Sequence, residues 1–287
     1  MIRSEEFHDW LSARGVEFFT GVPDSLLKPV CFYLADHVGD QHVVAANEGG
    51  AVGLACGYHL ATGKVPLVYL QNSGQGNTIN PLLSLADPEV YSIPMLLLIG
   101  WRGEPGTQDE PQHVKQGMVT TNLLETMDIP YRVLEQEPGA ARRSVDELVA
   151  IAAAENRPVA LLVRKGTFEP YKPEEQASGR FGMTREQAIG SVVAALGKTD
   201  AIVSTTGHIS RELYEYRARA GQGHEREFLT VGGMGHASQI AMGIALAKPD
   251  RQVFCLDGDG AMLMHMGGTA IVGAAGVQNF KHIVLNN

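Results

Sequence analysis

The sequence has few cysteines, no long apolar run and no excess of positive charge, and each absence excludes a class of protein. The three cysteines among 287 residues, Cys31, Cys56 and Cys255, show neither metal-binding spacing nor a disulfide framework. No stretch reaches the roughly 18–20 apolar residues that a membrane-spanning helix needs. The N-terminus has acidic residues where a signal peptide has its apolar core. We therefore expect a cytoplasmic protein.

The charge balance is acidic, with a formal net charge of −9. This charge argues against nucleic acid or an anionic membrane as a bulk partner, because both would be repelled. A local basic pocket can still bind a small anionic substrate. Apolar residues make up 44% of the chain and charged residues 19%, which is typical of a folded globular protein.

Short apolar runs alternate with helical stretches along the chain, which predicts α/β domains built on parallel sheets. The predicted strands cover residues 17–20, 42–46, 67–71, 95–99, 131–134, 159–164, 201–204, 228–231, 252–256 and 282–285. The predicted helices include residues 24–36, 49–62, 78–85 and 145–154, with capping-box patterns starting at Ser144 and Thr184. Strands such as 95–99 are apolar at successive positions, which indicates burial on both faces. The predicted fold class is two doubly wound parallel-sheet domains.

A polar segment with two prolines, residues 166–182, separates the two halves and predicts a surface linker. We expect one domain at 1–165 and another at 183–287. The second domain stops at Asn287, directly after a predicted strand, where the ligand-binding loop of a doubly wound sheet should begin. This ending predicts that the second domain is incomplete.

Two polar motifs follow neighbouring predicted strands of the second domain, Gly258-Asp259-Gly260 and, 25 residues later, Asn286-Asn287. An Asp259 carboxylate and an Asn287 amide oxygen can join diphosphate oxygens around Mg²⁺, which favours few protein ligands plus phosphates. The glycines let the backbone approach the phosphates without a Cβ clash. The alternative is an ordinary turn with a solvated aspartate.

The pattern resembles the diphosphate-binding motif of thiamine diphosphate-dependent decarboxylases, which pair a pyrimidine-binding domain with a pyrophosphate-binding domain. Longer runs are similar to the branch of this family that acts on phosphonopyruvate, namely FTGVPDS (19–25), ANEGG (46–50), QNSGQGN (71–77), GWRG (100–103) and DEPQH (109–113). The resemblance covers essentially the whole chain. It implies thiamine diphosphate and Mg²⁺ as cofactors and a homo-oligomer with active sites shared between subunits.

The resemblance also implies roles for residues that would touch the cofactor. Glu48 corresponds to the carboxylate that exchanges a proton with the aminopyrimidine ring. Met234 corresponds to the apolar residue that supports the bent cofactor, and the Gly232 carbonyl to the acceptor for its 4′-amino group. Without the resemblance, Glu48 would be interpreted as a helix-start glutamate near the positive end of the dipole, and Met234 as a core residue.

Small polar residues near a predicted helix start provide a candidate anion cradle, formed by Asn72, Ser73 and Gln75. Asp24 follows the first predicted strand, where it could handle protons around the substrate. The alternative for Asp24 is a helix N-cap.

A long predicted loop, residues 100–117, carries Arg102, His113 and Lys115. Loops of this length inside a compact domain are usually functional, so we expect one or more of these residues to bind the phosphonate or donate a proton. Solvated surface charges are the alternative for Arg102 and Lys115.

The resemblance implies decarboxylation of a small anionic 2-oxo acid, 3-phosphonopyruvate, to phosphonoacetaldehyde and CO₂. Sulfopyruvate or another 2-oxo acid is the alternative substrate for a related enzyme. A non-catalytic thiamine diphosphate-binding subunit or fragment is an alternative of a different class, favoured by the ending at Asn287. A Rossmann dehydrogenase is disfavoured because no G-x-G-x-x-G run opens a helix after the first strand.

Overall fold

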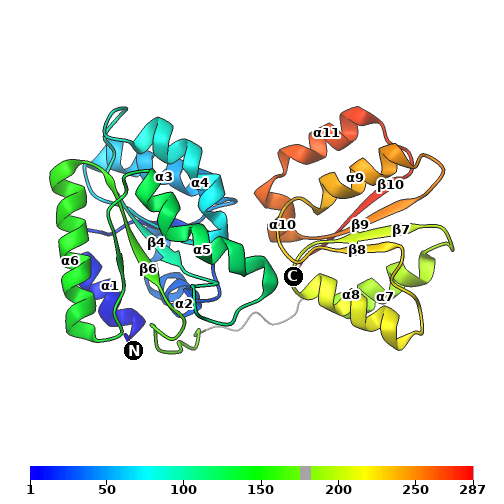
Figure 1. Cartoon of the computed structure of the whole chain (residues 1–287), viewed down its shortest axis with the longest axis horizontal. Helices are drawn as coiled ribbons and strands as arrows, with labels where there is room; N and C mark the ends of the chain where they lie inside the picture. The colour runs from blue at the N-terminus through cyan, green and yellow to red at the C-terminus, as the bar shows by residue number, and fades with distance from the viewer. Residues whose placement is uncertain (175–181, 287) are drawn as a thin grey trace. The chain divides into compact units, whose positions relative to one another are not determined.

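The computed structural model describes residues 1–174 and 182–286. The chain divides into two compact units, Met1–Gln176 and Ala177–Asn287. Each unit is a parallel β-sheet with helices on both of its faces (Figure 1), which confirms the predicted fold class. Asn287, predicted as a metal ligand, lies outside the described residues, as do residues 175–181 of the predicted linker.

The first unit contains a six-stranded parallel sheet with the order β2-β1-β3-β4-β6-β5. Its strands are β1 (Phe19–Gly21), β2 (His42–Val44), β3 (Leu67–Gln71), β4 (Met95–Gly100), β5 (Tyr131–Val133) and β6 (Pro158–Val163). All six residues of β4 are buried, as their continuous apolar character predicts. Because β2 and β3 lie on opposite sides of β1, the topological switch point is between β1 and β3.

Two helical layers cover this sheet. One layer consists of α1 (Ser4–Ser12), α2 (Lys28–His37) and α6 (Pro138–Glu155), and the other of α3 (Glu48–Thr62), α4 (Gln75–Pro81) and α5 (Pro111–Thr126). Alternate residues of β3 face opposite layers, with Leu67 and Tyr69 in one core cluster and Val68 and Leu70 in the other. The sheet is therefore buried on both faces and holds its strand ends in fixed positions.

The α6 helix begins earlier than predicted. Its first residue is Pro138, and the Glu137 carboxylate accepts the backbone N–H groups that follow it. Proline suits the first helical position because its missing N–H would have no partner there. Ser144 therefore lies inside the helix, and the capping box predicted at Ser144 is wrong. The capping box predicted at Thr184 is confirmed.

The predicted loop 100–117 is also shorter than expected, because α5 begins at Pro111. His113 and Lys115 consequently lie on the first turns of a helix. The start of this helix is hard to predict from the sequence because its first turns are polar. Its buried residues, Gly117, Thr120 and Leu124, come later.

Part of the predicted linker packs on the first unit. The Ile2 backbone N–H donates to the Thr167 carbonyl at 2.9 Å, and Ile2 forms a parallel bridge with Phe168. Both Thr167 and Phe168 are buried. The domain limits themselves, 1–165 and 183–287, stay a prediction.

The second unit has a four-stranded parallel sheet with the order β10-β9-β7-β8. Its strands are β7 (Ala201–Ser204), β8 (Glu227–Leu229), β9 (Val253–Gly258) and β10 (Phe280–Leu285). One face of the sheet is covered by α7 (Arg185–Ala195) and α8 (His208–Arg219). The unit also contains α9 (Ala237–Ala247), α10 (Asp259–Met264) and α11 (Gly267–Ala275). The α9 helix packs on the opposite face. The switch point lies between β7 and β9.

Among residues 1–174 and 182–286, no helix combines the length and the apolar character that crossing a membrane requires.

Candidate active site

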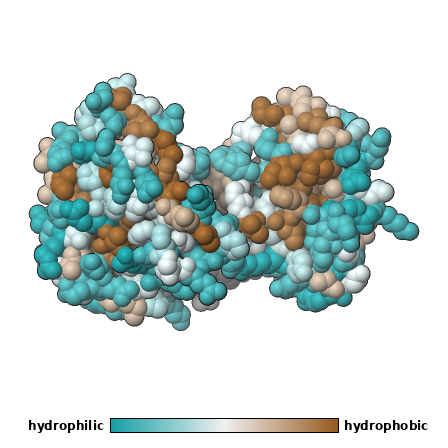
Figure 2. Space-filling view, viewed as in Figure 1, coloured by the Kyte–Doolittle hydropathy of each residue, from teal (hydrophilic) through white to brown (hydrophobic). Residues whose placement is uncertain are grey.

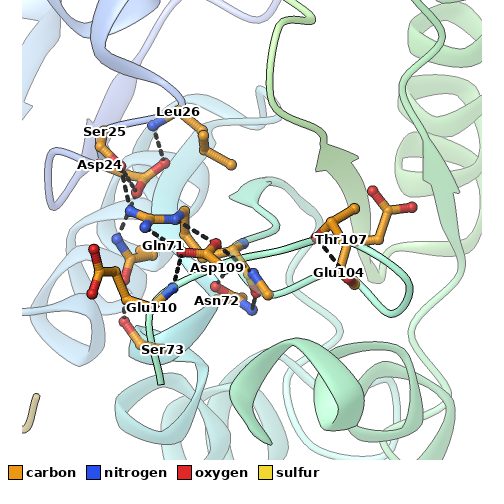
Figure 3. Close-up of polar contacts among 12 residues, drawn as sticks. Asp24, Ser25, Leu26, Gln71, Asn72, Ser73, Glu104, Thr107, Asp109 and Glu110 are labelled. Carbon is orange, nitrogen blue, oxygen red and sulfur yellow. Dashed lines mark hydrogen bonds and ion pairs between the residues drawn. The ribbon is translucent and has the colours of Figure 1, made fainter. Parts of the chain in front are cut away.

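Asp24 lies just beyond the end of β1, at the switch point of the first sheet (Figure 3). Its Oδ2 accepts the backbone N–H groups of Leu26 at 2.8 Å and Leu27 at 3.2 Å, and its Oδ1 accepts Gln71 Nε2 at 2.7 Å. Asp24 therefore fixes the turn that leads into α2, while Leu27 is the N-cap of that helix. A Cβ at Gly100 would lie 2.9 Å from Asp24 Cγ, so glycine is needed for this close approach.

Arg102 follows β4 and forms a two-pronged ion pair with Asp109 (Figure 3). Arg102 Nε donates to Asp109 Oδ2 at 2.8 Å, and Nη2 donates to Oδ1 at 2.5 Å. Arg102 Nη1 also donates to Ser25 Oγ at 3.0 Å. The Arg102 guanidinium and two backbone N–H groups hold the pKa of Asp109 well below its usual range. The predicted anion-binding arginine is thus held in one orientation.

Asn72 is fully buried and uses both ends of its side-chain amide within the protein. Its Nδ2 donates to the Arg102 carbonyl at 2.8 Å and to Thr120 Oγ1 at 2.9 Å, while its Oδ1 accepts the Arg102 N–H at 3.1 Å. Asn72 therefore joins the ends of β3 and β4 to α5. This arrangement fixes the backbone on either side of it.

Ser73, Gln75 and Lys115 differ in exposure. Ser73 is exposed, and its hydroxyl donates to Gln71 Oε1 at 2.8 Å. Gln75 is 2% exposed, and its Oε1 has no hydrogen-bond partner among the described residues. Lys115 is exposed on α5. Of these three candidates, Ser73 and Lys115 are accessible and Gln75 belongs to the support beneath them.

His113 is half-buried on α5, and its Nδ1 has no hydrogen-bond partner within the part of the chain that the structure describes. Burial, followed by the charge of Arg102, lowers the pKa of His113. The imidazole is therefore held in its neutral form over a wider pH range than an exposed histidine. A neutral imidazole can accept a proton, which is the property that a proton-handling group needs.

Glu48 opens α3 after the end of β2, and only 4% of its surface is exposed. The side chain of Asn47 caps the helix by accepting the Gly50 N–H at 2.8 Å. Asn77 Nδ2 donates to Glu48 Oε2 at 2.7 Å. A Cβ at Gly74 would lie 2.5 Å from Glu48 Cδ, so glycine leaves the space that the carboxylate fills. Sequence reasoning missed Asn77, whose partner is 29 residues away.

In the second unit, Gly258 ends β9, and Asp259 begins α10. The Met234 side chain extends over this turn, because a Cβ at Gly260 would lie 3.7 Å from Met234 Cε. Met234 is 43% exposed, so it is not the core methionine of the alternative interpretation. Gly232 precedes it in the same connection from β8 to α9. Three predicted cofactor-binding residues, Met234, Asp259 and Gly260, thus lie at or beside the turn after Gly258.

The switch point between β7 and β9 provides donors and space that suit a diphosphate. Thr205 directly follows β7, and its buried hydroxyl has no hydrogen-bond partner among residues 1–174 and 182–286. A Cβ at Gly258 would make ordinary van der Waals contact with Ile209 Cδ1 at 3.6 Å, so this turn is not crowded by neighbouring atoms. A hydroxyl, a carboxylate and exposed backbone fit a diphosphate with Mg²⁺. Sequence reasoning did not identify Thr205.

A hydrogen bond between Asp257 and His282 lies next to the same turn. The carboxylate of Asp257 is 1% exposed, accepts the Gly258 N–H at 3.0 Å, and lies 3.0 Å from His282 Nε2. His282 belongs to β10 and lies directly opposite Cys255 of β9. The pair therefore links the two strands that lead to the predicted metal-binding motifs, which is a structural role for His282.

Two family models match this chain. The model of the thiamine pyrophosphate enzyme N-terminal TPP binding domain matches residues 3–125, and that of the C-terminal TPP binding domain matches residues 205–287. These matches identify one thiamine pyrophosphate-binding domain in each unit.

Similar proteins carry decarboxylase names. Phosphonopyruvate decarboxylase of Streptomyces hygroscopicus is 34% identical over 100% of this chain and 73% of its own length. Sulfopyruvate decarboxylase subunit alpha of Methanococcus maripaludis is 35% identical over 57% of this chain and 95% of that subunit. Sulfopyruvate decarboxylase subunit beta of Methanocaldococcus jannaschii is 36% identical over 36% of this chain and 52% of that subunit. The chain belongs to the thiamine diphosphate-dependent decarboxylase family, whose cofactor is thiamine diphosphate with Mg²⁺ as the usual partner metal.

Proposed function

We propose that this protein decarboxylates 3-phosphonopyruvate, taking up one proton and releasing phosphonoacetaldehyde and CO₂. The observation that carries the substrate is the similarity of the entire chain to a phosphonopyruvate decarboxylase. The buried Glu48 carboxylate at the strand ends supports the decarboxylase chemistry.

Glu48 is proposed to touch the aminopyrimidine ring and to hold a proton at its ring nitrogen. Thiamine diphosphate supplies the nucleophilic carbon and the electron sink for the bond that breaks when CO₂ leaves. The Asn77 hydrogen bond and the space at Gly74 keep the Glu48 carboxylate in one place. A fixed carboxylate avoids the cost of reorientation during the reaction.

In the second unit, Asp259 and Asn287 are proposed to bind Mg²⁺, while Gly258 and Gly260 leave room for the diphosphate. Met234 is proposed to support the cofactor ring, and the Gly232 carbonyl to accept a hydrogen bond from it. Met234 is partly exposed and lies next to Gly260. This position favours the proposed role, because a partly exposed apolar side chain can pack against a ring.

Ser73 and Arg102 at the strand ends of the first unit, and Lys115 on α5, are proposed to bind the anionic substrate. Asn72 and Gln75 are buried, and they are proposed to contribute to substrate binding by fixing the backbone next to Ser73 and Arg102.

Asp24 and His113 are proposed to exchange protons around the substrate. The position of His113 near Arg102 supports this role, and its lowered pKa keeps the imidazole neutral, with a lone pair that can accept a proton.

A homo-oligomer with shared active sites is proposed as the working form. The α11 helix has no buried residue in this chain alone, although its sequence GGTAIVGAA is strongly apolar. Figure 2 shows apolar side chains on the surface of the second unit, and the exposed ones on α9 to α11 include Ile240, Leu246, Leu263 and Ile271. Surfaces of this kind favour contact with another protein chain. Sedimentation should give a mass above that of one chain.

A cytoplasmic location rests on the sequence and stays a prediction.

Sulfopyruvate is the second candidate substrate, because subunits named sulfopyruvate decarboxylase match parts of the chain at similar identity. The test is to compare kcat/KM for phosphonopyruvate, sulfopyruvate and pyruvate with thiamine diphosphate and Mg²⁺ present. We expect the highest value for phosphonopyruvate. A higher value for either other acid would refute the proposed substrate.

A further inference from the structure

We infer that Asp109 is a positioning residue for the anionic end of the substrate, because it orients the guanidinium of Arg102 at the end of β4. The inference rests on the proposed function in one respect, namely that Arg102 binds the substrate anion. Asp109 itself was not among the residues to which the sequence assigned a role.

The contact between the two side chains has the geometry of a fork. Arg102 Nε and Nη2 each donate to a different oxygen of Asp109, at 2.8 and 2.5 Å. Both side chains are largely buried, with 21% of the Arg102 side chain and 14% of the Asp109 side chain exposed. Paired hydrogen bonds of this kind fix the plane of the guanidinium, which a single contact does not.

Asp109 is itself held firmly. Besides the two donors of Arg102, it accepts the Gly103 N–H on Oδ2 and the Glu110 N–H on Oδ1, both at 2.8 Å. Four N–H donors therefore converge on one carboxylate (Figure 3). These donors stabilise the ionised form of the carboxylate and lower the pKa of Asp109.

The orientation of Arg102 leaves part of the guanidinium available. A guanidinium carries five N–H donors. The contacts to Asp109 use two of them, and the contact from Nη1 to Ser25 Oγ at 3.0 Å uses a third. Two N–H groups remain, one on each terminal nitrogen. An oxyanion can take both as a second fork, provided that the first fork stays in place.

Competition among carboxylates explains why Arg102 needs a fixed partner. The negative charges of Asp109, Asp24 and Glu110 all raise the pKa of Arg102, so three carboxylates act on one guanidinium. A freely rotating Arg102 could direct its donors to any of them. The fork to Asp109 selects one arrangement among these alternatives.

The test is a double-mutant cycle that uses methylphosphonate as a probe of anion binding. Its Kd is measured by calorimetry for the wild type, Asp109→Asn, Arg102→Gln and the double variant, without dependence on turnover. We expect Asp109→Asn to raise the Kd about tenfold, the size expected when a charge-assisted hydrogen bond is lost. Because Asp109 acts through Arg102, the same change should have no further effect in the Arg102→Gln background.

Glu104→Gln is the matched control, because it removes a different ion pair from the same loop. Glu104 Oε1 accepts Arg164 Nε at 2.7 Å and does not contact Arg102. The control should leave the Kd within about twofold of the wild type, as is usual for an exposed pair. For turnover of phosphonopyruvate, Asp109→Asn should raise KM more than it lowers kcat.

The inference is overturned if Asp109→Asn leaves the Kd unchanged, if it weakens binding equally in the Arg102→Gln background, or if Glu104→Gln has the same effect. A protein that does not bind methylphosphonate also overturns it. If the wild type binds methylphosphonate through Arg102 but does not turn over phosphonopyruvate, the proposed function is wrong and the role of Asp109 stands.

Discussion

Substitution of Gly74 by alanine should displace the Glu48 carboxylate while leaving the fold intact. The new Cβ would lie 2.5 Å from Glu48 Cδ, whereas atoms in ordinary van der Waals contact are at least 3.4 Å apart. Relief of this overlap requires a movement of about 1 Å, and misplacing a reacting group by that much can lower the rate about a hundredfold. The backbone at Gly74 has φ −84° and ψ −7°, which alanine adopts without strain.

Gly76→Ala is the matched control, because a Cβ at this position of α4 meets no atom within 4 Å. The assay is release of CO₂ from phosphonopyruvate at saturating thiamine diphosphate and Mg²⁺, together with the melting temperature of each variant. We expect kcat of Gly74→Ala to fall about a hundredfold with a melting temperature close to that of the control. Full activity in Gly74→Ala would refute the assigned position of Glu48. Loss of folding in that variant alone would also contradict this reasoning.

Two further predictions concern the half-buried histidines His282 and His113. His282→Ala removes the hydrogen-bonding partner of the buried Asp257 carboxyl group and should lower the free energy of unfolding by about 1–3 kcal/mol, measured with urea. A loss below about 1 kcal/mol would show that the pair does not link β9 to β10. Burial lowers the pKa of His113 in the folded protein below its value of about 6.5 in the unfolded chain. The unfolded chain therefore binds a proton more readily, and the free energy of unfolding should fall as the pH drops below about 6.5. His113→Gln should reduce this loss of stability in acid. The free energy of unfolding is measured with urea at pH 7.5 and 5.5, and an equal drop between these pH values in the variant and the wild type would contradict the prediction.

The sequence predicted the sheets well because their strands are apolar runs long enough to be unmistakable. The strands β3 and β7 coincide with the predicted residues, and the others differ by a few residues at their ends. Helix starts were harder to predict, because polar first turns resemble loops. α5 is the clearest example, since Pro111 looks like a loop residue until the buried positions of the following turns are seen.

The strand-end positions of Asp24, Glu48 and Asp259 could be predicted because each lies within a few residues of the end of a strand. Their partners could not be predicted in the same way. Asn77 reaches Glu48 from another helix, and Asp109 reaches Arg102 from the far end of a connecting loop. Such contacts depend on how the chain returns to the sheet edge, which no local pattern specifies.

The central claim is that Glu48 activates thiamine diphosphate for decarboxylation of a small 2-oxo acid. The most direct test compares CO₂ release from phosphonopyruvate by the wild type and by Glu48→Gln, each with and without added thiamine diphosphate. We expect the wild type to release CO₂ only when the cofactor is present, and Glu48→Gln to release it at least about a hundredfold more slowly despite continued cofactor binding. Equal release by the two proteins, or release by the wild type that ignores the cofactor, would contradict that claim.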